Sequence, residues 1–284
     1  MAKLRVSSTL NLHSGNKENL SVYIRDGLDF MKEIGFDAAD FPMGLLSSAQ
    51  EPWQTVIDEA KEAGEEIGIR FEVCHLPFST KIGQDPEFDA LFSENMLRCI
   101  EAAARLGVDY AVMHPNTTTV RRSGYNRLTE YDSVMAHLAP FAEKAAKVGV
   151  RLAVENMRPV PREIPVHRYC ADPVELCEIA DALGIGVCWD FGHAHIAGLK
   201  QSEALAYVGK RLKVLHVNDN VGWGDDHVPP FCGTLDWKDA MQGLSAVGFD
   251  GLFNYEIACR QPAASRPVFS RYLRTVADSL TDML

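Results

Sequence analysis

Short runs of apolar residues recur along the whole chain and alternate with segments whose apolar positions repeat with helical spacing. The runs are rich in Val and Ile, which is typical of strands buried on both faces of a sheet. They occupy residues 4–9, 36–41, 69–74, 108–113, 150–154, 185–189, 212–217 and 252–257. Six of them closely follow a glycine that fits the left-handed residue at the end of a helix, namely Gly35, Gly68, Gly107, Gly149, Gly184 and Gly248. The pattern predicts eight strands, most of them entered directly from a helix.

The segments between these strands predict helices. We expect them over residues 22–34, 53–67, 89–106, 131–148, 173–183, 202–208, 237–247 and 268–280. Strict alternation of strand and helix favours parallel strands joined by right-handed crossovers. Eight such units in 284 residues predict a single (β/α)8 TIM barrel, with residues 1–284 forming one domain. A doubly wound open sheet is the alternative, but no G-x-G-x-x-G turn follows the first strand.

Composition narrows the class of protein further. The chain carries 28 Lys and Arg against 39 Asp and Glu, a formal net charge of −11, which disfavours a protein that mainly grips nucleic-acid phosphates. No apolar run reaches the ~18 residues of a membrane helix, and the first residues do not resemble a signal peptide. The seven cysteines include no C-x-x-C pair, so we expect buried thiols in a reducing compartment. These features predict a cytoplasmic protein with no membrane partner and argue against nucleic acid as its ligand.

Imidazole and carboxylate side chains mark the ends of six consecutive predicted strands. The carboxyl ends of barrel strands form one rim that carries the active site, so these side chains are expected to lie together. They are His75, His114, Glu155, Asp190, His216 and Glu256, with His193, Asp225 and His227 in the loops close by. One such histidine is more often structural, and one such carboxylate is often a helix N-cap. Six in succession, on strands as apolar as AVENM and VCWDF, indicate a shared divalent cation that offsets the cost of burying charge.

The last four strands carry the strongest set of ligands. Three carboxylates and one imidazole suit Mn²⁺, Mg²⁺ or Co²⁺, with Zn²⁺ as an alternative. The predicted primary ligands of this one metal are Glu155, Asp190, His216 and Glu256. The other candidates, His75, His114, His193, Asp225 and His227, would bind further metals or hold substrate hydroxyls. Of the remaining histidines, we expect His137 and His167 to face solvent and His195 to be structural, whereas His13 could reach the pocket.

The motifs around these residues resemble the sugar phosphate isomerase/epimerase family of xylose-isomerase-like TIM barrels. The matching pieces are HLPF at His75, HPN at His114, VEN at Glu155, CWDFGHAHIAG at Asp190 and His193, LHVNDN at His216, DDHVPPFCGTLDW at Asp225 and His227, and YEIA at Glu256. Their order and spacing extend the likeness over nearly the whole chain. The same superfamily contains the endonuclease IV type of apurinic-site nucleases.

The resemblance to the epimerase branch implies a mechanism. The residues matching Glu155, Asp190, His216 and Glu256 would bind one divalent metal, with no organic cofactor. The two glutamates would exchange protons with substrate carbon from opposite faces while the metal stabilises an enediolate, and His193 would hold a substrate oxygen. We therefore predict a metal-dependent isomerase or epimerase of a small sugar, keto-sugar or polyol derivative. Dehydration of a keto-inositol or keto-sugar at the same site is an alternative, because both reactions begin by removing an α-proton.

The nuclease branch is a further alternative, since it uses a trinuclear zinc site and each of its ligand types has a counterpart here. Two departures count against it. HLPF lacks the polar-plus-tyrosine element with which those enzymes enter DNA, and His114 is followed by PN where they carry PG. The chain also departs from the sugar enzymes, because Phe231 and Cys232 stand where a glycine and an acidic residue are common.

A phosphorylated substrate would need a cationic site near the rim. The arginines that could serve are Arg158, Arg162 and Arg168 after the fifth strand and Arg260 and Arg266 after the eighth, although surface solvation explains any of them equally well. A homo-oligomer is a further expectation by analogy with such barrels.

Overall fold

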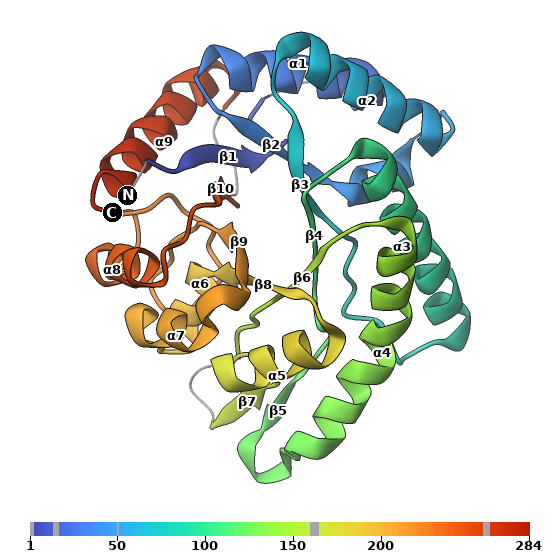
Figure 1. Ribbon diagram of the computed structural model, residues 1–284, viewed down its shortest axis with the longest axis vertical. Coiled ribbons are helices and arrows are strands. Elements are labelled where there is room, and N and C mark those ends of the chain that lie inside the picture. Colours follow the sequence, from blue (N-terminus) through green and yellow to red (C-terminus); the bar gives the residue numbers. More distant parts are fainter. Residues whose placement is uncertain (1–2, 14–16, 50, 160–164, 258–261) are drawn as a thin grey trace.

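Eight parallel strands form a ring at the centre of the molecule, and helices cover its outer face (Figure 1). The computed structural model describes residues 3–13, 17–49, 51–159, 165–257 and 262–284. The ring strands are β1 (Arg5–Thr9), β2 (Ala38–Pro42), β3 (Phe71–His75), β4 (Tyr110–Met113), β6 (Leu152–Glu155), β8 (Gly186–Asp190), β9 (Leu212–His216) and β10 (Leu252–Tyr255).

The ring closes between its last two strands. The strands pair in the order β10-β1-β2-β3-β4-β6-β8-β9. Beyond β9, the backbone N–H of Val217 donates to the carbonyl of Asn254 at 2.8 Å, and Glu256 N–H donates to Val217 O at 3.2 Å. The chain therefore folds as the single (β/α)8 TIM barrel that the sequence predicts.

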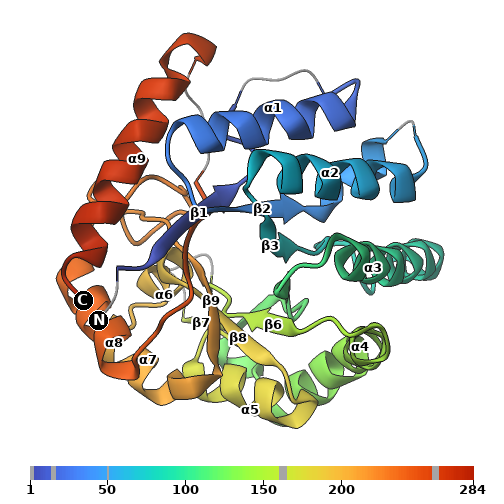
Figure 2. The same ribbon diagram turned by 45° about the horizontal axis from the view of Figure 1, so that its top comes forward.

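All eight predicted helices are present. They are α1 (Leu20–Glu33), α2 (Trp53–Ile67), α3 (Pro86–Leu106), α4 (Arg127–Val148), α5 (Pro173–Leu183), α7 (Gln201–Val208), α8 (Trp237–Val247) and α9 (Arg266–Thr281). A short helix α6 (Phe191–Ile196) and the 3-10 helices η1 (Met43–Ser48), η2 (Arg122–Gly124), η3 (Gly209–Arg211) and η4 (Ala263–Ser265) add to them. Helix α9 lies beside β1, so the two described ends of the chain are neighbours in both views (Figures 1 and 2).

Local sequence explains where these helices begin, end and pack. Five of the eight predicted helices start at an Asn or Asp whose side chain accepts a hydrogen bond from the first turn: Asn19, Asp85, Asn126, Asp172 and Asp236. The six predicted glycines all adopt φ between 64° and 85°, at or just after a helix end. Helix α1 buries Tyr23, Ile24, Leu28 and Met31 on one face, and a fully buried Ile or Leu contributes about 2 kcal/mol.

Small apolar side chains fill the barrel interior below the rim. Seven strands each contribute one residue to this layer, which consists of Ala38, Val73, Val112, Ala153, Cys188, Val214 and Leu252. Side chains alternate along a strand, so the residue two positions later also points inward, one layer nearer the carboxyl end. That next layer is entirely polar and consists of Asp40, His75, His114, Glu155, Asp190, His216 and Asn254. The chemistry of the chain therefore lies directly on top of its apolar barrel core.

An antiparallel ribbon outside the ring was not predicted. It pairs β5 (Thr119–Arg121) with β7 (Val166–Arg168) and lies close to α5 (Figure 1). Each strand has only three residues, too few for alternation to stand out in the sequence. His167 in this ribbon is not solvent-facing as expected, because its Nε2 lies 3.0 Å from both carboxylate oxygens of the buried Glu175.

In the described parts of the chain, no helix combines the length and apolar character needed to cross a membrane. Buried free thiols are confirmed at Cys74, Cys99, Cys170, Cys177 and Cys188, whereas Cys232 is exposed. Cys259 lies outside the described residues.

Candidate metal centre

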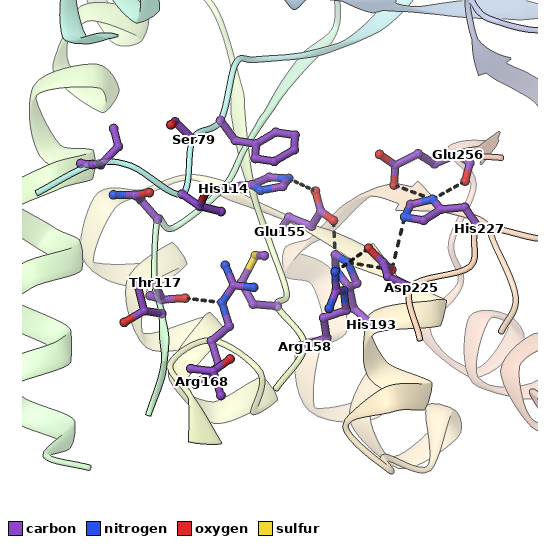
Figure 3. A pocket seen from close by; sticks show the side chains of 17 residues that line it. Ser79, His114, Thr117, Glu155, Arg158, Arg168, His193, Asp225, His227 and Glu256 are labelled. Atoms are coloured by element: carbon purple, nitrogen blue, oxygen red, sulfur yellow. Dashed lines mark hydrogen bonds and ion pairs between the residues drawn. The ribbon is translucent and has the colours of Figure 1, made fainter. Parts of the chain in front are cut away.

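Glu155 at the end of β6 is the point where the candidate ligands meet. Its side chain is 1% exposed, and Oε2 lies 3.1 Å from His114 Nε2, 3.2 Å from His216 Nδ1 and 3.5 Å from His75 Nε2. Oε1 lies 3.2 Å from His193 Nδ1 (Figure 3). Burial alone would raise the pKa of Glu155, but the positive charges of His216 and His114 lower it well below its usual range. One ionised carboxylate thus faces imidazoles from four different elements.

The four predicted primary ligands form one group. One ligand atom each from Glu155, Asp190, His216 and Glu256 lies within 4.8 Å of all the others. His216 Nδ1 is 3.2 Å from Oε2 of Glu155 and 3.2 Å from Oε2 of Glu256. Despite these distances, none of the three atoms has a hydrogen-bond partner among the described residues. Buried polar atoms without partners are costly, and a divalent cation between them removes that cost. The residues present therefore fit the predicted metal.

Asp190 is held in place by its neighbours. It caps α6, and its Oδ1 accepts a hydrogen bond from His193 N at 2.6 Å while Oδ2 accepts one from Asn218 Nδ2 at 2.7 Å. The Asn156 side chain binds the Asp190 backbone at both N–H (2.6 Å) and C=O (2.9 Å). Gly192 allows Asn218 to approach, since a Cβ at this glycine would lie 1.9 Å from Asn218 Oδ1. Burial raises the pKa of Asp190 to about 6.

A second group shares Glu155 with the first. It contains His75 and His114, whose Nε2 atoms are 3.1 Å apart, and both side chains are only 14% and 13% exposed. Phe78 stacks on His114 with ring centroids 4.5 Å apart and is itself 59% exposed. This aromatic face covers one side of the group and borders the space above it.

A third group contains His193, Asp225 and His227. Asp225 Oδ1 lies 3.5 Å from His193 Nε2 and 3.3 Å from His227 Nε2, and no described residue hydrogen-bonds to it. Asp225 Oδ2 forms an ion pair with Arg158 at 2.9 Å. Burial alone would lower the pKa of His227, but the adjacent Asp225 carboxylate raises it to about 9. His227 also has φ +48°, a strained conformation of the kind that occurs at functional sites. All nine predicted residues thus belong to groups of potential ligands.

A cavity of about 470 Å³ opens onto all three groups. Its lining includes His114, Glu155, His193, Asp225, His227 and Glu256, together with Ser79, Asn116, Thr117, Thr119, Arg158 and Arg168. Arg158 lies beside Asp225, whereas Thr117 and Arg168 lie on the side away from Asp225, His227 and Glu256 (Figure 3). This volume lies within the usual range for a small-molecule site.

Residues 28–275 match the family model described as xylose isomerase-like TIM barrel. The chain belongs to this family. Among curated proteins, the uncharacterized protein MJ1311 of Methanocaldococcus jannaschii is 26% identical over 229 residues, covering 76% of each chain. The uncharacterized protein y4fM of Sinorhizobium fredii is 26% identical over 186 residues, covering 65% of this chain and 58% of the relative.

Solved structures similar to this xylose isomerase-like barrel include several sugar epimerases. An L-ribulose 3-epimerase superposes with a TM-score of 0.76 at 14% identity, covering 98% of this chain and 95% of that one. A D-tagatose 3-epimerase-like protein has a TM-score of 0.74 at 20% identity, covering 98% of both chains. The 3-keto-D-glucoside 4-epimerase YcjR of E. coli has a TM-score of 0.72 at 19% identity, covering 96% and 100%. At these identities the likeness concerns the fold.

Sequence reasoning missed a polar chain inside this xylose isomerase-like barrel. Asn254 Nδ2 donates to Asp40 Oδ2 at 3.0 Å, and Ser7 Oγ donates to Asn254 Oδ1 at 2.7 Å. Asp40 is 1% exposed, and its burial raises the pKa of the carboxyl group. A signal was present, because Asp40 stands two residues after the inward-facing Ala38, as Glu155 stands after Ala153. Asp40 was overlooked because it lies within the apolar run and not after it.

The other histidines lie outside the cavity of this xylose isomerase-like barrel. His13 is buried and packs on Tyr23 with ring centroids 4.2 Å apart, so it does not reach the pocket. His137 is half-buried beside Phe141, which corrects the expectation that it faces solvent. His195 Nε2 hydrogen-bonds to Thr234 Oγ1 at 2.9 Å, a structural contact as expected.

Only some of the arginines proposed to bind a substrate phosphate lie in the cavity. Arg158 and Arg168 line it. Arg266 instead donates to the backbone carbonyl of His13 and is not part of the lining. Arg162 and Arg260 lie outside the described residues.

Proposed function

We propose that the protein is a divalent-cation-dependent isomerase or epimerase of a small sugar, keto-sugar or polyol derivative. Membership of the xylose isomerase-like family and the fold shared with L-ribulose and D-tagatose-type epimerases support this proposal. The observation that carries it is the pair of carboxylates Glu155 and Glu256, which line one cavity, lie on either side of His216, and each have an oxygen that accepts no hydrogen bond from a described residue.

The two glutamates have the properties of proton carriers. Burial alone would raise the pKa of Glu256, but the charge of the adjacent His216 lowers it to about 2, so the carboxylate is ionised and able to accept a proton. Glu155 is ionised for the same reason. They belong to β6 and to the residue that follows β10, so they enter the cavity from different parts of the ring. One glutamate removes the proton beside the substrate carbonyl and the other returns one.

The direction of that return decides the product. A proton delivered to the opposite face of the same carbon inverts the centre, and one delivered to the neighbouring carbon moves the carbonyl. A cation held by Glu155, Asp190, His216 and Glu256 would supply positive charge that polarises the substrate carbonyl and makes the adjacent C–H more acidic. His193 fixes its ring by a contact of 2.8 Å between Nδ1 and the carbonyl of Asn156, leaving Nε2 near the cavity for a substrate oxygen.

Solvent exchange tests the proposal. The Mn²⁺-loaded protein is incubated in D₂O with D-tagatose, L-ribulose, a 3-keto-glucoside and a keto-inositol, and proton NMR follows the carbon next to each carbonyl. We expect deuterium to enter at least one sugar, and the product to distinguish epimerisation, isomerisation and dehydration. E155Q and E256Q should each slow exchange by about 10²-fold or more, because each removes a general acid–base group.

The control is E94Q, which changes an exposed glutamate on α3. Circular dichroism verifies that all three variants fold. Full exchange in both E155Q and E256Q would contradict the proton-carrier roles, and absence of exchange with the whole panel would contradict the sugar chemistry.

Phosphodiester hydrolysis at a three-metal site is the second candidate function. It is favoured by one observation: the nine candidate ligands fall into several overlapping sets of three or four side chains, each of which could hold a metal ion. The Arg158–Asp225 ion pair argues against it, because a guanidinium already supplies positive charge at the third group. Elemental analysis and incubation with an abasic DNA duplex separate the two candidates: about three zinc ions per chain together with strand cleavage would favour the nuclease, and one metal without cleavage the sugar enzyme.

A further inference from the structure

The cavity has two chemically different ends. One end holds the three ligand groups and the two glutamates of the proposed reaction. The other end is built by the segment after β4 and by the β5–β7 ribbon, and it presents the Arg168 guanidinium beside the Thr117 hydroxyl. Proton transfer at the glutamates requires none of these groups, so this end of the cavity calls for a separate explanation.

Side-chain contacts hold the β5–β7 ribbon in an orientation in which Arg168 faces the cavity. Consecutive residues of β7 point to opposite sides. The His167 side chain points to Glu175, a residue of α5. Glu175 also accepts hydrogen bonds from the Tyr125 hydroxyl and, at 3.1 Å, from the Cys170 N–H. The next residue, Arg168, therefore points the other way, into the cavity (Figure 3). The buried Glu175 contacts thus fix the backbone from which this guanidinium extends.

A hydrogen-bond chain also fixes the guanidinium itself. Arg168 Nε donates to Thr117 Oγ1 at 3.1 Å, and Thr117 Oγ1 donates to the carbonyl of Tyr169 at 3.0 Å. Neither terminal nitrogen of Arg168 has a hydrogen bond or ion pair with any described residue. The side chain is therefore held in one orientation with both Nη groups available, which is the arrangement a two-oxygen anion requires.

The two arginines of the cavity differ in their counter-charges. Arg158 is paired with Asp225 at 2.9 Å, whereas no described carboxylate pairs with Arg168. Burial and the neighbouring Arg158 lower the pKa of Arg168 to about 10, which still leaves it charged at neutral pH. A partly buried charge without a counter-ion costs free energy, and an anionic group on a ligand would recover that cost.

We propose that Arg168 is the centre of an anion subsite, and that the substrate is a sugar carrying a carboxylate or phosphate group away from its reacting carbons. That the bound sugar is a substrate rests on the proposed function. The anion subsite itself rests only on the geometry of Arg168, Thr117 and the cavity. It makes Arg168 a residue that determines specificity, and it gives the β5–β7 ribbon the task of positioning that residue.

Three sugars with the same carbonyl position test the subsite: D-fructose, D-fructuronate and D-fructose 6-phosphate. Isothermal titration calorimetry on the Mn²⁺-loaded protein, in a chloride buffer of low ionic strength, measures binding independently of turnover. We expect one or both anionic sugars to bind roughly ten- to a hundredfold more tightly than fructose, the range of a hydrogen-bonded charge pair. The stronger of the two identifies carboxylate or phosphate as the preferred group.

Substitution of the arginine supplies the second arm. R168Q should remove the preference for the anionic sugar and leave fructose binding unchanged. R168K, which keeps the charge without the planar fork, should retain part of it. The matched control R121Q changes an exposed arginine on β5 of the same ribbon that does not line the cavity, and it should bind like the parent protein. If R168Q fails to fold, the salt dependence of the parent protein decides, because only anion binding should weaken as KCl is raised.

Two results would overturn the subsite: equal affinity for all three sugars, or a loss in R168Q that is the same for fructose as for the anions. Failure of the proposed function is distinguishable from both. Anion binding that depends on Arg168, without deuterium exchange in any of the sugars, would keep the subsite and discard the isomerase. Deuterium exchange that is unchanged in R168Q would support the isomerase and contradict the subsite.

Discussion

Gly192 offers a sharp test of how the candidate metal centre is assembled. This glycine lies in the first turn of α6, directly after Phe191 and two residues after Asp190. A Cβ there would be 1.9 Å from Asn218 Oδ1 and 2.9 Å from Asn220 Nδ2. The Asn218 oxygen would have to move by about 1 Å or more in an environment where its side chain is fully buried. G192A should therefore displace the amide that holds Asp190 Oδ2.

The magnitude follows from the contacts that are lost. The hydrogen bond between Asn218 and the Asp190 carboxylate involves a charged group and contributes about 1.5–3 kcal/mol. Crowding a packed interior costs about 1–3 kcal/mol more. The higher helix propensity of alanine returns less than about 1 kcal/mol. We expect G192A to lower the free energy of unfolding by about 3–5 kcal/mol and, by misplacing a ligand, to weaken metal binding about 10–100-fold.

Two assays measure these effects. Urea denaturation followed by circular dichroism gives the free energy of unfolding, and competition with a metal-sensitive dye gives the metal affinity. The control is G44A, since nothing lies within 4 Å of a Cβ at Gly44. N218A should remove most of the additional cost of G192A, because the two changes act through the same contact. Unfolding and metal binding indistinguishable between G192A and G44A would refute the reasoning.

Three further results are expected. The apparent metal affinity should rise about tenfold per pH unit for each displaced proton near and above neutrality. Burial alone would lower the pKa of His216, but Cys188 and the carboxylates Glu256 and Glu155 outweigh burial and raise that pKa well above its usual range, so metal binding must displace a proton. Calorimetry in buffers of different ionisation enthalpy counts the displaced protons. Removing the metal with a chelator should lower Tm by about 4–5 °C relative to protein loaded at 100 times Kd, as seen by scanning calorimetry; an unchanged Tm would contradict the metal site. E175Q should destabilise the fold by about 2 kcal/mol in urea titrations because it removes a buried charged acceptor, whereas the exposed E94Q should change it by less than about 0.5 kcal/mol.

The regular parts of the barrel were predictable because each strand and helix carries its own pattern. An apolar run between glycine-capped amphipathic segments has few alternatives, and all eight strands and eight helices lie where the periodicity indicates. The ligand-bearing strand ends were also visible, since parallel strands bring their carboxyl ends to one rim. The catalytic and ligand roles of those residues stay predictions, to be decided by exchange and metal analysis.

The β5–β7 ribbon shows why other features could not be predicted. Its three-residue strands pair across the helix α4 and the strand β6 that lie between them in the chain, so the pairing depends on the folded barrel. His167 becomes a buried partner of Glu175, and Arg168 becomes part of the cavity, through that pairing alone. Nothing in the local sequence HRYC indicates that His167 and Arg168 are anything other than surface residues.

The sequence by itself determined the barrel, the order of its strands and the identity of the side chains at its rim, because these depend on periodicity and on the fixed direction of parallel strands. Only the tertiary structure decided which of those side chains share one space. Glu155 lies beside four imidazoles, and Asp225 contacts two histidines and an arginine. No described residue pairs with the terminal nitrogens of Arg168. Distances between side chains on different strands depend on barrel closure and on side-chain rotamers, and neither is encoded in any one segment of the chain.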